Sequence, residues 1–228
     1  MDKIDLLLLK LMEKIELSKM SIENEFLYNN GKNLTPISDM AIINPRINKT
    51  GLLDNMLVSF VPMSCVGADN GLMNTDKERR LGEVKNGYTP FQQGDVLFAK
   101  ITPCMENGKM VIVPDLKNNY GFGSTEFHVL RPKDGVCADY LYRHISSRKI
   151  RTEAVSYMTG AVGQKRVPAR FLANYKISLP SFSEQIKISE KMNTAFSRFD
   201  KISQKTKEME KCVKILKQEM LNKYFTMS

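Results

Sequence analysis

The apolar positions divide the chain into two helical ends and a mixed middle. Between Ser183 and Phe225 there is no Gly and no Pro, and apolar or tolerated residues recur in alternating steps of four and three. This heptad seam comprises Ile188, Met192, Ala195, Phe199, Ile202, Thr206, Met209, Val213, Leu216 and Met220. Such a pattern predicts a long helix that needs a second helix to bury its apolar stripe. Pro180 lies just before it, and Ser183 is the predicted N-cap.

A shorter apolar pattern occupies residues 2–28. One side of a helix there would carry Ile4, Leu8, Leu11, Ile15 and Ile22. Ser18 and Glu25 interrupt the strict repeat, which favours an amphipathic helix over an autonomous coiled coil. Asn29-Asn30-Gly31 is predicted to end it. Two interpretations stay open: the helix packs on a core, or it packs beside the C-terminal helix.

The middle of the chain carries both periodicities. Strands are predicted at Leu57–Met63, Asp95–Ile101, Met110–Val113, Thr125–Leu130 and Tyr175–Leu179, and a helix at Ala138–Met158. Gly and Pro punctuate the remainder. We therefore expect an α+β fold: a mixed domain over 34–182, preceded by an amphipathic helix in 1–33 and followed by a long coiled-coil-forming helix in 183–228.

Composition narrows the class of partner. The chain has 228 residues, and 34 Lys+Arg against 25 Asp+Glu give a net charge of +9, which favours a polyanionic partner. Its four cysteines are scattered without a CxxC pair, so we expect neither a disulfide framework nor a zinc site, and a reducing cytoplasm is the simpler interpretation. The apolar run Leu6–Leu9 is too short for a membrane span or a signal sequence.

The positive charge is concentrated in one window of the middle domain. Against the single acid Glu153 stand Arg143, Arg148, Lys149, Arg151, Lys165, Arg166 and Arg170, a net charge of +6. On one continuous helix, Arg143, Ser147 and Arg151 would share a face. The following "TGAVGQKRVP" (159–168) sets Gln164, Lys165 and Arg166 beside two glycines, a composition suited to phosphate oxygens and base edges. The alternatives are a nucleic-acid surface, which we favour, and a solvated basic surface.

Tests for enzymatic chemistry find little. There is no Asn/Asp-Pro-Pro-aromatic motif of an amino-methyltransferase, and Gly121 and Gly123 lack the rest of a dinucleotide fingerprint. Asp115 and Glu126 resemble part of a metal-nuclease pattern, but no Lys stands two positions after Glu126. We expect no catalytic residue, cofactor or metal, and keep a small Mg²⁺-dependent nuclease as an alternative.

Between two predicted strands lies an unusual loop in "GDVLFAKITPCMENGKMVIV" (94–113). It gathers Lys100, Thr102, Asn107 and Lys109 in a few residues. Such a loop is compatible with three alternatives: a metal site, a catalytic elbow or an anion-binding site. Asn107 either caps the tight turn at Gly108 or reads a base, and the turn is favoured.

Several stretches, taken in order, resemble a known family. "GDVLFAKITPCMENGK" (94–109), "GFGSTEFHVLRP" (121–132), "GAVGQKRVPARFLANYKISLPSFSEQIKI" (160–188) and the long helix after them are similar to the specificity subunit of type I restriction–modification systems. The resemblance covers roughly residues 34–225. It implies a subunit that recognises DNA for an enzyme complex in which methylation and cleavage belong to other subunits. The usual subunit has two target-recognition domains, each followed by a long helix, and the helices pack antiparallel and space the domains.

This chain holds one such domain and one such helix. The resemblance therefore implies a half-subunit or a truncated one, with two copies associating through the helices and reading an inverted-repeat site; a full-length partner encoded elsewhere is the alternative. The implied partners are double-stranded DNA and methyltransferase subunits, with the presence of a restriction subunit left open.

These considerations give two sets of candidate residues. The DNA-binding set is Lys100, Thr102, Lys109, Arg143, Arg151, Gln164, Lys165 and Arg166. The dimerisation set is Met192, Phe199, Ile202, Met209, Val213 and Leu216. A basic coiled-coil interaction protein that does not bind DNA is the third functional alternative.

Overall fold

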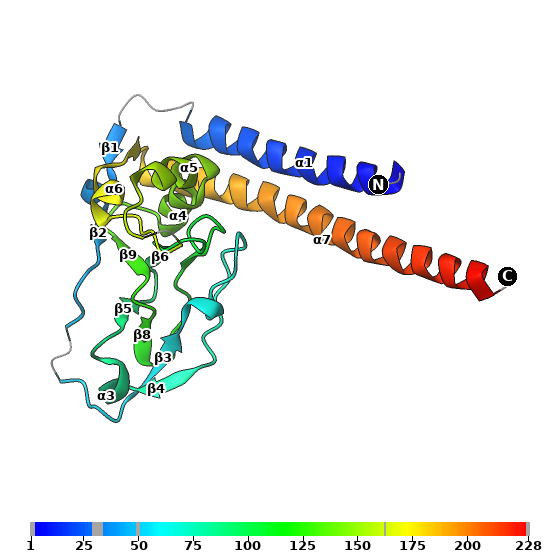
Figure 1. The fold of residues 1–228 in the computed structure, drawn as a ribbon. Coiled ribbons are helices and arrows are strands. Elements are labelled where there is room, and N and C mark those ends of the chain that lie inside the picture. Colours follow the sequence, from blue (N-terminus) through cyan, green and yellow to red (C-terminus); the bar gives the residue numbers. More distant parts are fainter. Residues whose placement is uncertain (1–2, 29–33, 49–50, 162, 227–228) are drawn as a thin grey trace. The chain divides into compact units, whose positions relative to one another are not determined.

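A computed structural model describes residues 3–28, 34–48, 51–161 and 163–226, and the chain falls into two compact units (Figure 1). One unit is Asn30–Ser189, and the other combines Met1–Asn29 with Glu190–Ser228. The first mixes strands with short helices and the second is helical, so the predicted α+β class is confirmed. The predicted stop at Asn29-Asn30-Gly31 lies outside the described residues.

The helical unit is an antiparallel pair formed by α1 (Lys3–Glu23), which continues into a π-helical turn (Asn24–Tyr28), and by α7 (Phe182–Thr226). Three contacts fix the direction, because the α7 number falls as the α1 number rises. Lys217 Nζ donates to Asp5 Oδ1 at 2.7 Å, Ser203 Oγ donates to Met12 Sδ at 3.6 Å, and Lys19 Nζ donates to Asp200 Oδ1 at 2.8 Å, in that order along α1. The N-terminal helix thus packs beside the C-terminal one, the second of the two interpretations.

The start of α7 corrects a prediction. The N-cap is Ser181 rather than Ser183, because the Glu184 carboxylate folds back onto Ser181. Ser181 donates to Glu184 Oε2 through both its backbone N–H (3.0 Å) and its hydroxyl (2.6 Å). These hydrogen bonds lower the pKa of Glu184. Ser183 lies within the first turn, where its hydroxyl is 3.3 Å from that of Ser181.

The mixed unit contains two four-stranded sheets. The first, in the order β2-β9-β6-β7, is antiparallel throughout and comprises β2 (Ala41–Ile43), β9 (Phe127–Pro132), β6 (Val96–Ala99) and β7 (Met110–Ile112). The second, in the order β4-β3-β8-β5, pairs β3 and β8 in parallel and comprises β4 (Glu78–Arg80), β3 (Leu57–Val61), β8 (Tyr120–Gly123) and β5 (Thr89–Gln92). A separate antiparallel pair joins β1 (Leu34–Pro36) to β10 (Lys176–Ser178).

Short helices complete this unit. They are α2 (Ile37–Met40), α3 (Leu81–Val84), α4 (Ala138–Ser146), α5 (Arg148–Tyr157) and α6 (Ala169–Asn174), with 3₁₀ turns at Met63–Cys65 and Lys117–Asn119. One apolar cluster lies where the two sheets meet, since it combines Phe91 of β5 and Val61 of β3 with Leu97 of β6 and Val129 of β9.

One continuous helix over Ala138–Met158 was predicted, and this is wrong. The helix breaks at Ser147, which adopts an extended backbone (φ −61°, ψ 147°) and caps α5 by accepting a hydrogen bond from the Ile150 N–H. Ser147 is fully buried. Arg143 and Arg151 therefore lie on two different helices, so the argument that they share one helix face fails.

A buried carboxylate ties the turn before β6 to the neighbouring strand β9 in the first sheet. Asp95, in the turn before β6, is 1% exposed. Its oxygens accept hydrogen bonds from Arg131 Nε (2.7 Å) and Nη2 (2.8 Å) of β9 and from the Gln92 N–H (2.8 Å). The paired carboxylate raises the pKa of Arg131. Three hydrogen-bond donors from these two residues compensate the desolvation of this charge.

Removing the Asp95 charge should therefore destabilise the chain strongly. We expect Asp95→Asn to lower the free energy of unfolding by about 3 kcal/mol, near the low end for a buried ion pair because Arg131 is partly exposed. Asp54→Asn is the control, since the Asp54–Lys85 pair is largely exposed and worth less than about 1 kcal/mol. Urea denaturation measures both, and equal losses would contradict this assignment.

Candidate nucleic-acid interface

Two segments more than sixty residues apart form one backbone ladder at the end of β6. The Lys100 N–H donates to Glu126 O at 2.9 Å, and Lys100 O accepts from the Val167 N–H at 2.8 Å. The Thr102 N–H donates to Lys165 O at 3.0 Å. The loop after β6 and the glycine-flanked turn are thus adjacent, and five of the proposed DNA-binding residues gather here: Lys100, Thr102, Gln164, Lys165 and Arg166.

The glycine-flanked turn is closed by its own backbone. Thr159 and Arg166 exchange hydrogen bonds of 3.0 and 2.8 Å. Gly160 adopts φ +126°, and a Cβ there would come within 2.8 Å of Gln164 O, so the turn requires glycine at this position. Gln164 and Lys165 project from it and are both exposed. Val162 lies outside the described residues.

Arg166 stabilises this turn through hydrogen bonds to Glu126 and to the turn's own backbone. Its Nε and Nη2 donate to the two carboxylate oxygens of Glu126 at 2.9 and 2.8 Å, and its Nη1 donates to Gln164 O at 2.9 Å. The hydrogen bond from Arg166 lowers the pKa of Glu126, against the opposing effect of burial. Arg166 thus uses three of its hydrogen-bond donor groups within the protein.

Lys109 and Arg151 also have internal partners. Lys109 Nζ donates to Met63 O (3.1 Å) and Val66 O (2.9 Å). Arg151 Nη1 contacts Asp69 Oδ1 at 2.8 Å and donates to Glu106 O at 3.0 Å. These contacts tie the 63–69 loop to the turn after β6. The Arg143 guanidinium lies over the Tyr142 ring, 5.4 Å from its centroid.

Three of the four remaining candidates leave the polar groups of their side chains open to solvent. Within the described part of the chain, the side chains of Lys100, Gln164 and Lys165 have no hydrogen-bond or ion-pair partner. The Thr102 hydroxyl, in contrast, accepts from the Lys165 N–H at 3.2 Å. These contacts divide the predicted residues into two groups, a division that charge alone could not give. The bracing group is Lys109, Arg151 and Arg166. The solvent-facing group is Lys100, Gln164 and Lys165.

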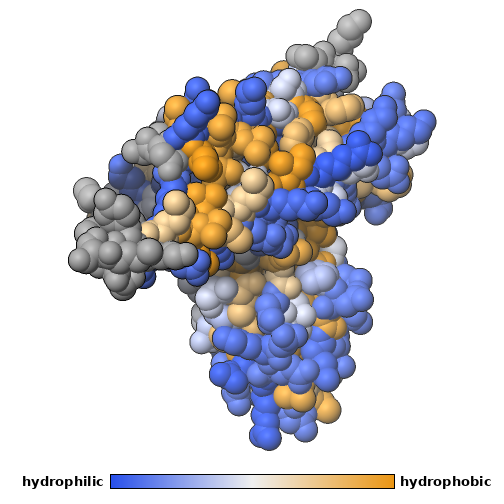
Figure 2. All heavy atoms as spheres, turned by 90° about the vertical axis from the view of Figure 1, so that its right-hand side faces the viewer, coloured by the Kyte–Doolittle hydropathy of each residue, from blue (hydrophilic) through white to orange (hydrophobic). Residues whose placement is uncertain are grey.

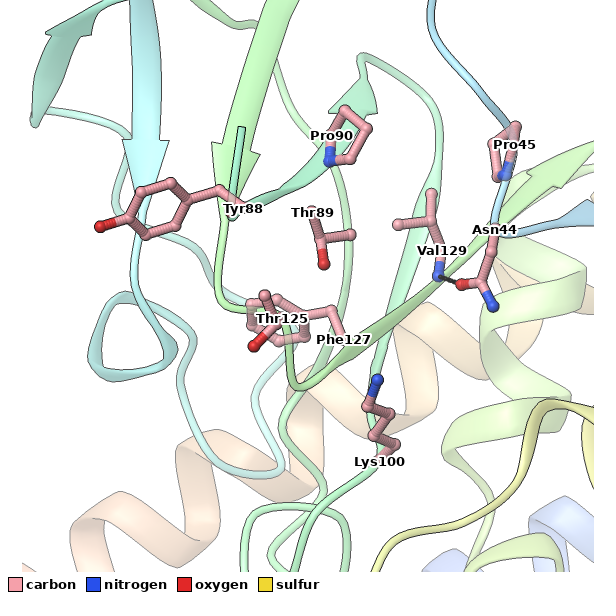
Figure 3. A pocket seen from close by; sticks show the side chains of 10 residues that line it. Asn44, Pro45, Tyr88, Thr89, Pro90, Lys100, Thr125, Phe127 and Val129 are labelled. Atoms are coloured by element: carbon pink, nitrogen blue, oxygen red, sulfur yellow. Dashed lines mark hydrogen bonds between the residues drawn. The ribbon is translucent and has the colours of Figure 1, made fainter. Parts of the chain in front are cut away.

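Sequence reasoning missed a pocket beside this ladder (Figure 3). It has a volume of about 370 Å³ and lies between β5 of one sheet and β9 of the other. Lys100 lines it together with Thr89, Thr125 and Tyr88. No sequence signal could have grouped these residues, because the pocket exists only where the two sheets meet.

A buried histidine links the pocket wall to the ladder. His128 Nε2 is 2.9 Å from Val167 O, and its Nδ1 is 3.2 Å from Asn44 Nδ2. Because Val167 O can only accept and the amide nitrogen can only donate, the neutral tautomer with a proton on Nε2 fits both partners. Asn44, at φ +53°, is held by further hydrogen bonds to the backbone of Val129. Burial lowers the pKa of His128.

The nuclease alternative receives no structural support. Asp115 accepts a hydrogen bond from Gln93 Nε2, and Glu126 is occupied by Arg166. Among the residues that the structure describes, no three His, Cys, Asp or Glu side chains lie close enough together to hold a metal ion. A search of the same residues for a helix long and apolar enough to cross a membrane also finds none.

Comparison with known families decides the identity. Residues 35–211 match the model of the type I restriction modification DNA specificity domain. The chain belongs to this family. The match covers the whole ladder, the pocket and most of α7, so the resemblance inferred from the sequence motifs is confirmed.

Specificity subunits from Escherichia coli are among the relatives of this specificity-domain chain. It is 43% identical to the EcoEI type I restriction enzyme specificity subunit over 153 residues, which are 67% of this chain and 25% of that protein. It is 36% identical to the EcoAI specificity subunit over 185 residues, 81% of this chain and 31% of that protein. The chain thus spans about a quarter to a third of the curated relatives that it matches.

Solved structures share the fold of this specificity-domain chain. One comes from work on complex assembly and conformational transition of the type I R-M system, with a TM-score of 0.70 and 16% identity over 97% of this chain and 54% of that one. Another is the HsdS subunit from Thermoanaerobacter tengcongensis, with a TM-score of 0.62 and 18% identity over 97% and 53%. At these identities the likeness establishes the fold.

Protonation of His128 should weaken the fold below neutral pH. The unfolded chain binds a proton near pH 6.5, whereas the folded chain binds it only at a lower pH, so the free energy of unfolding falls as pH drops below about 6.5. His128→Gln, which keeps an N–H for Val167 O, should flatten this decline. Burial lowers the pKa of His144 to about 3, and this group contributes equally in both proteins. Urea denaturation from pH 7.5 to 5 compares them, and parallel curves would refute the assignment.

Proposed function

We propose that the chain recognises a specific sequence in double-stranded DNA as the specificity component of a type I restriction–modification complex. The carrying observation is the solvent-facing group: Lys100, Gln164 and Lys165 converge from two distant segments, and their side chains have no partner among the described residues. An amide can read a base edge, whereas ammonium groups contact phosphates and set the register of the protein on the duplex.

We further propose that the chain is not itself an enzyme and works in the cytoplasm, where methyltransferase subunits, and a restriction subunit in systems that have one, act at the DNA it recognises. Family membership and the occupied carboxylates of Asp115 and Glu126 support this assignment. Five further residues complete the proposed interface. Thr102 and Arg143 belong to its surface, and the bracing group of Lys109, Arg151 and Arg166 mainly shapes it. The domain division proposed from the sequence assigns recognition to 34–182.

Self-association through α7 is the second part of the proposal. The seam has two sides: Met192 and Thr206 are buried within the helical unit, whereas Ile202, Met209 and Leu216 are 43%, 57% and 57% exposed. Phe199 and Val213 are half-buried between them. Figure 2 shows apolar, orange side chains gathered among hydrophilic, blue ones on one face of the molecule. An isologous dimer would cover the exposed side, and α7 would space two recognition domains.

DNA binding should depend on the charge of the turn. Because a lysine that contacts a phosphate displaces a counterion, Lys165→Ala should weaken binding to all duplex sequences and reduce the slope of log K against log salt by about 1. Gln164→Ala should leave that slope unchanged and alter the sequence preference. Fluorescence anisotropy with a target selected from random DNA, in a sodium chloride series, measures both.

The anisotropy series and a separate plasmid cleavage test distinguish the proposal from its alternatives. Wild-type affinity and slope in Lys165→Ala would refute the proposed surface. Cleavage of plasmid by the pure chain with Mg²⁺ would favour a nuclease. Salt-independent behaviour with no DNA binding at all would favour a coiled-coil interaction protein.

The exposed side of the seam should control assembly. Met209→Asp combined with Leu216→Asp would bury unpaired charges in a dimer without entering the helical unit's own core, so we expect a monomer by light scattering at micromolar concentration. Ile215→Asp is the matched control, since Ile215 is 58% exposed but lies about 100° further round the helix. A wild-type monomer, or equal dimers in all three proteins, would contradict self-association through this surface.

A further inference from the structure

The pocket beside the ladder joins elements of both sheets. Thr89 lies in β5 of the second sheet, Val129 in β9 of the first, Thr125 between β8 and β9, and Lys100 just after β6. In Figure 3 the Lys100 side chain extends toward the space bounded by Thr89, Thr125 and Val129. The pocket therefore forms only when the two sheets are docked.

The chemistry of its lining suits an anion. Lys100 supplies a half-buried ammonium group, and Thr89 and Thr125 supply hydroxyls. No Asp or Glu belongs to the lining residues. Glu126, next in sequence to Thr125, is turned to its ion pair with Arg166. One cation and two hydroxyl donors without a carboxylate can satisfy a phosphodiester, whereas a metal ion would find no anionic ligand.

The wall of the pocket is fixed before any ligand arrives. Asn44 adopts a left-handed backbone, rare for a residue other than glycine, and is held by hydrogen bonds to Val129 and by its contact with His128. Asparagine tolerates this backbone conformation better than most residues, and these contacts hold it in place. A preformed site loses little conformational entropy on binding.

The position of the pocket connects it to the proposed interface. Lys100 lines the pocket with its side chain, while its backbone O accepts from Val167, next to the turn that carries Lys165. We infer that this pocket binds one backbone phosphate of the DNA through Lys100, Thr89 and Thr125, so that a DNA strand is held across the junction of the two sheets. This inference rests on the proposed function.

The test uses the full chain and a duplex that carries its selected target. Lys100→Met should reduce the slope of log K against log salt by about 1. Lys77→Met is the control, because this substitution removes the same charge from an exposed position. Lys77 lies just before β4, at the opposite edge of the sheet from β5. Thr89→Val with Thr125→Val should weaken binding about tenfold for each lost hydrogen bond to the charged phosphate, whereas exposed Thr152→Val on α5 should not.

A methylphosphonate scan locates the contact on the DNA. Replacing each phosphate in turn by an uncharged methylphosphonate should reveal one position that weakens binding to the wild type and to Lys77→Met but not to Lys100→Met. Because this result is a difference between DNA positions within one protein, a partial loss of folded protein does not imitate it.

The outcomes separate the two proposals. If Lys100→Met keeps the wild-type slope and the wild-type methylphosphonate profile while Lys165→Ala loses affinity, the pocket assignment is wrong and the proposed function stands. A changed base preference in Lys100→Met with an unchanged profile would mean that the pocket receives a base, which also overturns it. If the wild type fails to bind the duplex in a salt-dependent way, the proposed function falls, and this inference falls with it.

Discussion

The backbone ladder between 100–102 and 165–167 is the interaction on which the rest of the site depends. It joins the loop after β6 to a turn that the chain reaches only after three further strands (β7, β8 and β9) and the helices α4 and α5. Arg166 reinforces it with a bidentate ion pair to Glu126, which immediately precedes β9. Without this ladder, Gln164 and Lys165 would sit on an untethered loop, and Lys100 would have no defined direction relative to them.

The basic residues of the middle domain do two different jobs, and their partners tell them apart. Lys109, Arg151 and Arg166 donate to carbonyl or carboxylate oxygens of the protein, and so they shape loops at the cost of some of their own capacity to bind a ligand. Lys100 and Lys165 project from the frame that those contacts build. A net charge of +9 indicates a polyanionic partner but says nothing about this division.

Clear apolar patterns were readable from the sequence, whereas elements that depend on side-chain caps or tertiary packing were not. The helix α7 follows from its heptads, and β6 follows from its run of four consecutive apolar residues, all of them buried. β5 and β8 escaped notice because Pro90 and Gly121 are poor strand formers; a Cβ at Gly121 would lie 2.1 Å from the Phe91 ring, so packing overrides propensity there. Ser147 breaks a helix through a side-chain cap that periodicity does not reveal. The candidate site was predicted as a region, whereas its ladder and its pocket required the fold.

The most direct test of the central claim is ultraviolet cross-linking of the full chain to photoreactive target DNA, followed by mass spectrometry of the attached peptides. A chain that recognises DNA through the solvent-facing group should cross-link at residues 100–102 and 163–166, with little attachment along β4 and β3, the opposite edge of the second sheet. Cross-links concentrated at β4 and β3, with none on the ladder or the turn, would contradict the account.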